Sequence, residues 1–467
     1  MSDSTDEVPD QVILKDKRTG RRKRMAARYR RFRVRNSPQR NLVYGFLLYT
    51  FVGFVLLSLP WLQKQPTALI DNLFIATSAI STTGLVTVSV FDSYTWLGQL
   101  VVVLLIQIGG IGYLTFTTYY LLTTTKTITH WHQRLLKTAF VMPQEIQIQD
   151  FLKSVIVFTV VMETLGAILF FVAFKLEGIE TGFALWSSVF HSVSAFCTAG
   201  FGLYNDSFMS FYDNAFINIV ISVLAITGAM GFIVVTDVWY MMNGKSERLT
   251  FTTKIILYGF LVLLGAGTLL VYLYEPEVQG LGEVEKWLTS FFQAMTATTT
   301  VGFNTIDTGA LTLPILLFVI FLMYIGASPS GTAGGMKITT LTAVLSLVKS
   351  RLRGEESITF LGRSIPAERI YVATATFVFY VSLVSVFTFL LTFSEQAPFQ
   401  NILFEVASAL GTVGLSAGIT GDLSSFGKAV LIVTMFVGRL GVITFGLALL
   451  AHKMRSDVKI VEDDIAI

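Results

Sequence analysis

Charged residues are scarce in this sequence, since Asp, Glu, Lys and Arg make up only 14% of its 467 residues. A soluble domain carries about 25%, so this chain has too few polar residues to build a water-facing surface. Cysteine is almost absent, and the single Cys197 excludes an intrachain disulfide framework. Hydrophobic residues make up 53%, and the mean hydropathy is +0.66. This composition excludes disorder for most of the chain and leaves an integral membrane protein, with apolar runs of about 20 residues expected.

The first 40 residues differ from everything after them. Residues 15–40 hold 13 Lys and Arg and a single acid, Asp16. This stretch is not a signal peptide, because it is too long and no cleavage site follows the first apolar run. We interpret 1–40 as a basic cytoplasmic segment that touches anionic lipid, in preference to nucleic acid. Contact with a soluble protein partner fits equally well.

Apolar runs follow residue 40 in a fourfold rhythm of long run, short run and long run. The leading long runs cover about 42–62, 152–173, 254–274 and 370–393. The short runs cover about 67–80, 183–196, 285–297 and 398–410, and the closing long runs about 96–122, 215–241, 311–349 and 427–451. At 1.5 Å per residue the short runs cannot cross a bilayer core of about 30 Å, although they can enter it halfway and return. A repeat of this size defines the architecture.

Basic residues are distributed very unevenly across this topology. With the amino terminus inside, 28 of the 34 Lys and Arg fall in the two tails and the loops between repeats. Four lie on the opposite side, where acidic residues gather instead: Lys64, Lys175, Lys286 and Lys428. The asymmetry agrees with the positive-inside rule and predicts a multi-pass protein of the cell membrane with both termini in the cytoplasm. An acidic outer mouth would concentrate cations.

Each short run ends in a turn with a shared pattern, TTGL, TAGF, TVGF or TVGL. The turns contain no ionisable side chain, which excludes a catalytic or charged-ring site, but they offer backbone carbonyls. Glycine permits positive φ, so carbonyls can point at an axis, toward which the short helices direct their negative carboxyl ends. Carbonyl rings that replace a hydration shell form the filter of potassium channels, so we predict K⁺ at these carbonyls. The filter residues are Thr82, Thr83, Gly84, Thr198, Ala199, Gly200, Thr300, Val301, Gly302, Thr412, Val413 and Gly414.

The fold class that follows is an all-α integral membrane protein with 8 transmembrane helices. Four tandem units of helix, pore helix, filter loop and helix are expected around a pseudo-fourfold axis. Non-helical backbone at membrane depth is tolerated where it is buried or lines a wet cavity, and four such loops around one axis meet that condition. We divide the chain into 1–40, unit 1 at 41–122, a cytoplasmic loop and unit 2 at 123–241, unit 3 at 242–349, unit 4 at 350–452 and a cytoplasmic tail at 453–467.

The sequence resembles the membrane subunit of the Ktr/Trk/HKT superfamily of potassium transporters, over about residues 41–452. The carriers of the resemblance are the four turns, HSVSAFCTAGF at 191–201, FNTID after the third turn and GRLGVITF at 438–445. The start directly at unit 1 is most like the Ktr branch. The second turn departs from the pattern NNAGF that relatives often have, and the third reads TATTTVGFN instead of an Arg-Thr-Ala-Gly-Phe-Asn pattern.

The resemblance implies K⁺ uptake when all four filter positions are glycine, as they are here. A serine at the first position is associated with Na⁺ transport in plant relatives, whereas this chain has Gly84. The resemblance also implies a homodimer in the lipid bilayer and a cytoplasmic ring of RCK-type nucleotide-binding subunits. The chain itself contains no Walker or dinucleotide fingerprint, and the residues leave open whether Na⁺ is required.

The closing run of unit 3 is interrupted at 326–335 by ten small or helix-breaking residues. Proline removes a donor and glycines weaken a helix, so an unwound segment that lines a cavity fits better than a helix kinked by small residues. The resemblance implies an intramembrane gate loop here. The residues assigned to the gate are Gly326, Ser328, Pro329, Ser330, Gly331, Gly334, Gly335, Lys337 and Arg439.

Arg439 lies deep in the last apolar run, where an unpaired Arg costs about 2.5–3.5 kcal/mol on insertion scales. A permanent positive charge in a cation path is a barrier, so gating is a natural role. The alternative is a salt bridge to Glu163 or Asp237, or contact with gate-loop carbonyls. Lys337 could hold the loop or face the pore.

Two other classes of function compete with a gated pore. An alternating-access cation symporter needs ionisable coupling residues near the midplane, and only Glu163, Lys337 and Arg439 qualify. A membrane enzyme is disfavoured because no nucleophile–base pair appears at depth. For Glu163 the default is a helix–helix hydrogen bond. The histidines lack partners at metal-ligand spacing, so we predict no metal site among His130, His132 and His191.

Overall fold

The computed structural model describes residues 38–112, 148–244 and 246–450. Most of the predicted basic segment, the tail 453–467 and both His130 and His132 lie outside the described residues. The described chain is nearly all helix. Its strands form two short pairs: β1 (Ile325–Gly326) runs parallel to β2 (Met336–Lys337), and β3 (Thr359–Phe360) runs antiparallel to β4 (Arg363–Ser364).

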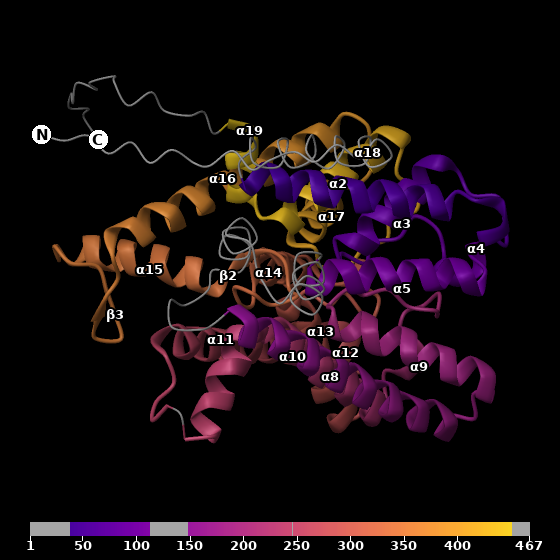
Figure 1. Cartoon of the computed structure of the whole chain (residues 1–467), viewed down its shortest axis with the longest axis horizontal. Helices are drawn as coiled ribbons and strands as arrows, with labels where there is room; N and C mark the ends of the chain where they lie inside the picture. The colour runs from indigo at the N-terminus through magenta and orange to yellow at the C-terminus, as the bar shows by residue number, and fades with distance from the viewer. Residues whose placement is uncertain (1–37, 113–147, 245, 451–467) are drawn as a thin grey trace, which may run out of the picture.

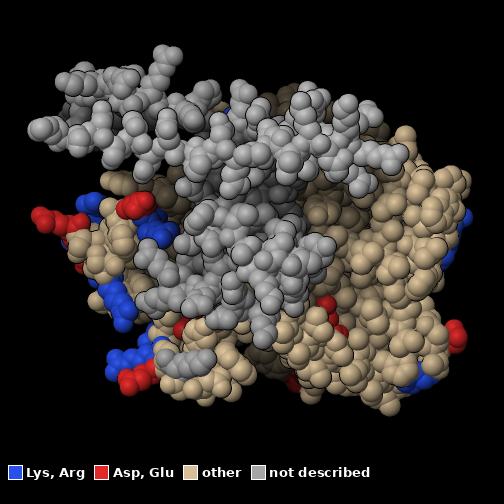
Figure 2. Space-filling view, viewed as in Figure 1, with Lys and Arg blue, Asp and Glu red and all other residues tan. Residues whose placement is uncertain are grey.

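Four long helices begin the four units: α2 (Pro38–Leu57), α8 (Ile148–Leu176), α11 (Phe251–Tyr274) and α16 (Ala367–Thr392). Each exposes large apolar side chains along its outer face, such as Phe51, Leu165, Val262 and Phe389. Apolar surface on this scale suits lipid and not water. Away from the grey atoms, Figure 2 shows the charged side chains mainly toward the ends of the molecule in this view, with a broad uncharged surface between them.

In each unit a short helix and a second long element follow. The short helices are α3 (Leu69–Ile80), α9 (Thr181–Phe196), α13 (Glu283–Thr299) and α17 (Phe399–Gly411). The second elements are α5 (Trp96–Ile111), α10 (Ala215–Met242), α14 (Leu313–Tyr324) with α15 (Ile338–Leu352), and α18 (Ser425–Leu440) with α19 (Val442–Leu450). Two single-turn helices, α4 (Val90–Ser93) and α12 (Pro276–Gln279), lie in connecting loops.

The units pack head to tail into a closed ring. Each second helix packs against the short helix of the next unit: α5 on α9, α10 on α13, α14 on α17, and finally α18 back on α3. In Figure 1 the indigo α3 and α5 lie between the magenta α8 and α9 below and the yellow α18 above, with α17 beside α3. An ion pair strengthens the contact that closes the ring, because Lys428 Nζ of α18 lies 2.8 Å from Asp71 Oδ1 of α3.

The second elements of units 2 and 4 are broken, which corrects the continuous closing runs 215–241 and 427–451 expected from the sequence, and the described helix of unit 1 ends at the corresponding glycine. The pair α18 and α19 bends by 100° at Gly441, α10 kinks at Gly231, and α5 ends at Gly112. We call these three the hinge glycines; their φ values are 85° at Gly112, 76° at Gly231 and 81° at Gly441. Proline is absent from these breaks, so the positive φ of glycine is the cause.

A second glycine stands three residues before each hinge glycine. It lies against the last turn of its unit's short helix, too close to a carbonyl oxygen there to admit a Cβ atom. The pairs are Gly109 with Ile80, Gly228 with Phe196 and Gly438 with Leu410. Glycine therefore has two roles in each second helix. One glycine permits close packing on the short helix, and the other breaks the second helix three residues later.

By length and composition, five described helices could each cross a membrane, and α18 with α19 would make a sixth if the bent pair is one span. The five are within α2, α8, α10, α11 and α16. Since α5 and α14 are shorter, the total of eight spans stays a prediction.

Candidate filter and gate

The four turns that follow the short helices share one backbone structure. In each, the residue before the filter glycine donates its N–H to a carbonyl five residues back: Thr83 to Ser78, Ala199 to Ser194, Val301 to Thr296 and Val413 to Ser408, over 2.8–3.1 Å. The preceding threonine donates to a carbonyl three residues back, always that of an alanine. This bond pair is the Schellman helix ending.

The threonine of each turn adopts the left-handed conformation that this ending requires. Its φ is 51° at Thr82, 49° at Thr198, 56° at Thr300 and 48° at Thr412. Glycine usually occupies this position, and a β-branched residue there is an outlier that costs about 1–3 kcal/mol. Four repetitions of the same strain show that a threonine hydroxyl is retained at each turn against its conformational cost.

The filter glycines bring the four turns into contact with one another. A Cβ atom added at Gly84 would collide with the carbonyl oxygen of Ala199, and the same relation links Gly200 to Val301, Gly302 to Val413, and Gly414 to Thr83. The chain of contacts runs through all four turns and returns to the first. Glycine is required here for two reasons, since φ is between 65° and 96° at these positions and no space exists for a side chain.

Serine side chains support turns 1 and 4 from behind. Ser78 Oγ accepts the Gly84 N–H at 3.1 Å, and Ser408 Oγ accepts the Gly414 N–H at 3.0 Å. The full shared pattern is Ser/Thr-Ala-x-x-Thr-x-Gly, at 78–84, 194–200, 296–302 and 408–414. Sequence reasoning stopped at the last three residues of this pattern and missed the hydroxyl at its start, although its spacing is the same in all four copies.

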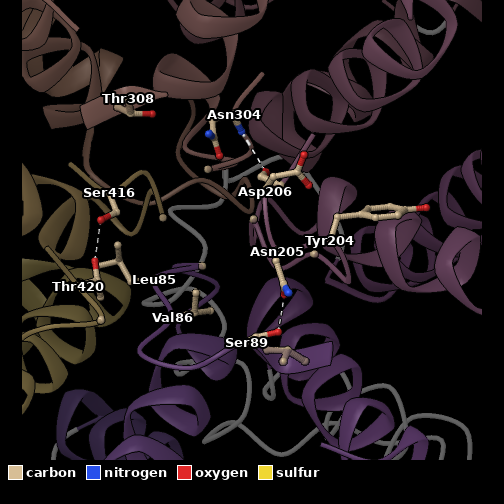
Figure 3. Close-up of a pocket in the computed structure, with 18 of the residues that line it drawn as sticks. Leu85, Val86, Ser89, Tyr204, Asn205, Asp206, Asn304, Thr308, Ser416 and Thr420 are labelled. Carbon is tan, nitrogen blue, oxygen red and sulfur yellow. Dashed lines mark hydrogen bonds between the residues drawn. The ribbon is translucent and has the colours of Figure 1, made fainter. Parts of the chain in front are cut away.

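Outside the ring lies an open cavity of about 400 Å³, lined by all four filter glycines and by loop residues of the four units. Figure 3 shows its polar wall, where Asn205 is hydrogen-bonded to Ser89 and Ser416 to Thr420. Asp206 and Asp307 also belong to this wall. The cavity therefore presents oxygen atoms and negative charge directly above the ring, an arrangement that attracts cations.

On the other side of the ring, residues 325–337 form an unwound loop between α14 and α15. The parallel pairing of β1 with β2 draws its two ends together. The loop reaches the filter threonines, because Thr332 Oγ1 lies 3.1 Å from Thr198 Oγ1 and the Gly334 N–H donates to Thr300 Oγ1 at 3.1 Å. Thr332 and Ala333 lie within the segment 326–335 that the sequence assigned to the gate, but neither was singled out as a gate residue, since nothing local marks them.

Two cations hold this loop by its carbonyl oxygens. Lys337 Nζ donates to the carbonyls of Ala333 and, at 3.0 Å, Gly334. Arg439 donates to the Thr332 carbonyl and, through its other terminal nitrogen, to the carbonyls of Gly109 and Gly110 at the end of α5. Arg439 thus joins units 3, 4 and 1, and the loop, α5 and α18 surround a cavity of about 500 Å³.

The alternatives considered for the buried ionisable residues can now be separated. Arg439 contacts gate-loop carbonyls, and the described ion pairs, Lys428 with Asp71 and Arg353 with Glu355, do not include it. The salt bridge to Glu163 or Asp237 is therefore wrong. Glu163 instead joins helices: its carboxylate accepts from Cys197 Sγ at 3.8 Å, and its backbone carbonyl accepts from Ser192 Oγ of α9 at 2.6 Å.

Comparison with known proteins gives consistent matches over most of the chain. A family model described as TrkH, cation transport protein, matches residues 42–460. Ktr system potassium uptake protein B of Bacillus subtilis (strain 168) is 38% identical over 417 residues, which are 88% of this chain and 93% of that protein. The protein of the same name from Vibrio alginolyticus is 34% identical over 441 residues, covering 93% and 96%.

Two further matches extend the comparison. Potassium/sodium uptake protein NtpJ of Enterococcus hirae is 33% identical over 448 residues, covering 93% of this chain and 98% of that protein. Among solved structures, the potassium transporter TrkH of Vibrio parahaemolyticus superposes with a TM-score of 0.68 at 21% identity, covering 87% of this chain and 84% of that one. At this identity the structural match shows a shared fold.

Proposed function

Since the chain belongs to the TrkH family of cation transport proteins, we propose that it takes up K⁺ across the cell membrane through the ring of four filter turns. Family membership also confirms the expectation of a membrane transporter and not an enzyme. The relatives named above are potassium uptake proteins, which favours K⁺ as the transported ion. The presence of glycine at all four filter positions agrees with that choice.

The observation that carries the proposal is the closed chain of contacts from turn to turn. Each filter glycine lies against a carbonyl of the next turn, so backbone oxygens of four segments gather in one place at the carboxyl ends of four short helices. Such oxygens replace the hydration shell of a cation, and the helix ends add partial negative charge. K⁺ would be coordinated by the carbonyls of residues 82–84, 198–200, 300–302 and 412–414.

We assign control of the flux to the loop at 326–335 together with Lys337 and Arg439. The loop lies directly beneath the filter threonines, and the Arg439 guanidinium bridges it to α5. A fixed positive charge below a cation filter raises the barrier to passage. Opening would require the loop to leave these partners, in exchange for contacts that another state supplies.

Partners, sodium and orientation complete the proposal. A homodimer and a cytoplasmic ring of RCK-type nucleotide-binding subunits follow from the resemblance to Ktr systems, with both termini in the cytoplasm as the charge asymmetry indicates. The relative NtpJ is named for potassium and sodium uptake, so Na⁺ is the second ion to test. K⁺ and Na⁺ are transported or regulatory ions in this proposal.

Replacing filter glycines tests the assignment directly. Gly84→Ser and Gly414→Ser each place a side chain against a neighbouring carbonyl, so we expect a lower K⁺ preference over Na⁺ in uptake by reconstituted protein. Unchanged selectivity in correctly folded variants would overturn the filter. Rate saturation with a strict ion stoichiometry in the same vesicles would favour an alternating-access symporter instead.

A further inference from the structure

One position on each short helix lies behind the chain segment that leaves the filter turn. It stands nine residues before the filter glycine. In units 2 and 4 its side chain accepts the backbone N–H three residues after that glycine, from Leu203 to His191 Nε2 at 3.1 Å and from Ala417 to Glu405 Oε1 at 3.0 Å. We call it the strut position; its four occupants are Ile75, His191, Gln293 and Glu405.

Among the four strut residues, Glu405 makes the most hydrogen bonds to the segment that leaves its filter turn. Its side chain is fully buried in α17. Besides the Ala417 N–H, its carboxylate accepts the hydroxyls of Ser416 at 2.6 Å and Thr420 at 2.7 Å. All three donors belong to the segment that leaves turn 4. Three hydrogen bonds from one short segment converge on this side chain, so Glu405 fixes the segment against α17.

His191 supports turn 2 with a neutral ring. Because the Leu203 N–H donates to Nε2, Nδ1 carries the ring proton and donates to the Ser187 carbonyl at 2.8 Å. Tyr204 stacks on the ring with centroids 5.3 Å apart, and Phe208 packs at its edge at 5.0 Å. Hydrogen bonds at both nitrogens and aromatic contacts at the face and edge therefore fix the orientation of the His191 ring.

The other two strut positions make no such bond. Ile75 has no acceptor. Gln293 is fully buried, yet neither its amide oxygen nor its amide nitrogen has a hydrogen-bond partner in the described part of the chain. The hydroxyl of Thr305, three residues after the filter glycine of unit 3, is also buried and unpaired among the described residues. A buried polar group left unpaired is costly and needs an explanation.

Turns with a hydrogen-bonded strut alternate around the ring with turns that lack one, because the contacts run in order from turn 1 to turn 4 and back. We propose that His191 and Glu405 are positioning residues that set the preference of the filter for K⁺ over Na⁺, with turns 1 and 3 as the compliant pair. The proposal rests on the proposed function of the ring as a K⁺ filter. Two turns on one diagonal, each fixed by its strut, keep the ring from contracting around the smaller Na⁺. Turn 3 is held by the Thr296 hydroxyl at the Phe303 carbonyl but has no strut bond at Gln293, so its exit segment can yield as an ion passes.

The test compares K⁺ and Na⁺ uptake into proteoliposomes that contain the full chain with its partner subunits. Glu405→Gln keeps the shape of the side chain but turns one acceptor into a donor that faces other donors. We expect its K⁺ over Na⁺ preference to fall about fivefold, the factor expected for loss of the equivalent of one net hydrogen bond. His191→Phe, which fills the aromatic surroundings but accepts nothing, should lower the ratio to a similar degree. If both fluxes fall together at an unchanged ratio, the residues are merely structural and the proposal fails.

Gln293→Leu is the matched control at the same position of another turn. It removes an amide that has no partner, so the ratio should stay at the wild-type value; an equal loss there would overturn the distinction between supported and open turns. Thr420→Val removes only one donor to Glu405 and should give a smaller loss, which protects the test if Glu405→Gln does not fold. Gly414→Ser is measured alongside: if it alters the ratio while Glu405→Gln and His191→Phe do not, the filter stands and the struts are wrong.

Discussion

The filter turns and the elements beneath them differ in how closely the four units resemble one another. On the outer side all four turns have the same left-handed threonine, the same two backbone hydrogen bonds and the same glycine contact. On the inner side the second helices break at similar places but in different ways, by a hinge glycine in three units and by the loop 325–337 in unit 3. Coordination of a spherical ion needs matching oxygen donors from every direction, whereas control of its flow can be assigned to one or two units.

A single alignment position illustrates the contrast. The residue after the first glycine of each break is Gly110, Ala229, Ala327 or Arg439. Three of these are small, and the fourth is a long cation that reaches across to units 1 and 3. Since all four units belong to one chain, this change occurs once in the ring and leaves the other three positions untouched.

The largest effect on K⁺ uptake should come from disturbing a contact between two filter turns. Gly302→Ala adds a methyl group against the Val413 carbonyl at φ 83°, so we expect selective K⁺ uptake to fall by about tenfold or more, as for loss of one or two well-made contacts. The matched control is Gly418→Ala, because Gly418 has φ 90° but nothing within 4 Å of an added Cβ. The Gly418→Ala variant therefore introduces backbone strain without a collision between the added Cβ atom and a neighbouring turn. Equal losses in the two variants would mean that contact between turns is unimportant.

A smaller effect of opposite sign, a rise in basal K⁺ flux, should follow from removing the contacts of Arg439, which occur in one unit only. Arg439→Gln removes the charge and the bridge from the loop to α5, so the basal K⁺ flux without the regulatory partner should rise about threefold to tenfold, as expected when a loop loses one or two charge-assisted bonds. Deletion of residues 328–334 should raise it further. Uptake is measured in vesicles at matched protein levels, and a folded deletion variant with reduced flux would contradict the gate.

The seam between units 4 and 1 offers a test of stability. Lys428 and Asp71 are only 13% and 11% exposed as side chains, so Asp71→Asn should lower the free energy of unfolding by about 2 kcal/mol by leaving a mostly buried cation unpaired. The double variant Asp71→Asn with Lys428→Met should recover part of this loss. Thermal unfolding in detergent measures both, and additive losses would show that the pair is not coupled.

The smallest effect concerns Glu395, in the loop between α16 and α17. Burial raises the pKa of this carboxyl, but hydrogen bonds from Ser424 and Ser394 outweigh burial and hold the pKa below its ordinary value. A depressed pKa contributes stability above the ordinary value that is lost as the pH falls through the folded-state pKa. Wild type should therefore lose about 1–2 °C in Tm relative to Glu395→Gln as the pH is lowered from about 6 to about 3, with most of the loss below the ordinary pKa of the carboxyl. Parallel pH profiles would contradict this.

Much of the local structure could be predicted from the sequence. Run lengths indicated the short helices to within a few residues, since a segment of 12–17 residues such as α3 or α13 is too short to span. The glycine and proline content of 326–335 indicated the unwound loop, because helix breaking is a local property. The hinge glycines were equally local but were missed, because single glycines in apolar helices are common and their φ is not visible in the sequence.

Long-range contacts could be predicted only in part. Contact of Arg439 with gate-loop carbonyls was one of the alternatives that the sequence offered, but its bonds to Gly109 and Gly110 were not expected. Arg439 hydrogen-bonds to residues more than 100 positions away, and Glu405 was passed over because its role depends on the fold of the segment at 416–420. His191 was considered only as a metal ligand, whereas its ring supports the backbone at Leu203. Such roles follow from which buried donors lack a partner, and only packing decides that.

The left-handed threonines also bear on how the protein is synthesised. Each holds a conformation that costs about 1–3 kcal/mol when nothing supports it. The carbonyl of Thr83 meets its neighbour at Gly414, so the first turn obtains its last contact only after the ribosome has made the fourth unit. A nascent chain that ends before α17 holds three turns in an open arc, and strain favours their relaxation. The ring should therefore close as a late, cooperative step of biogenesis, after the helices have entered the bilayer.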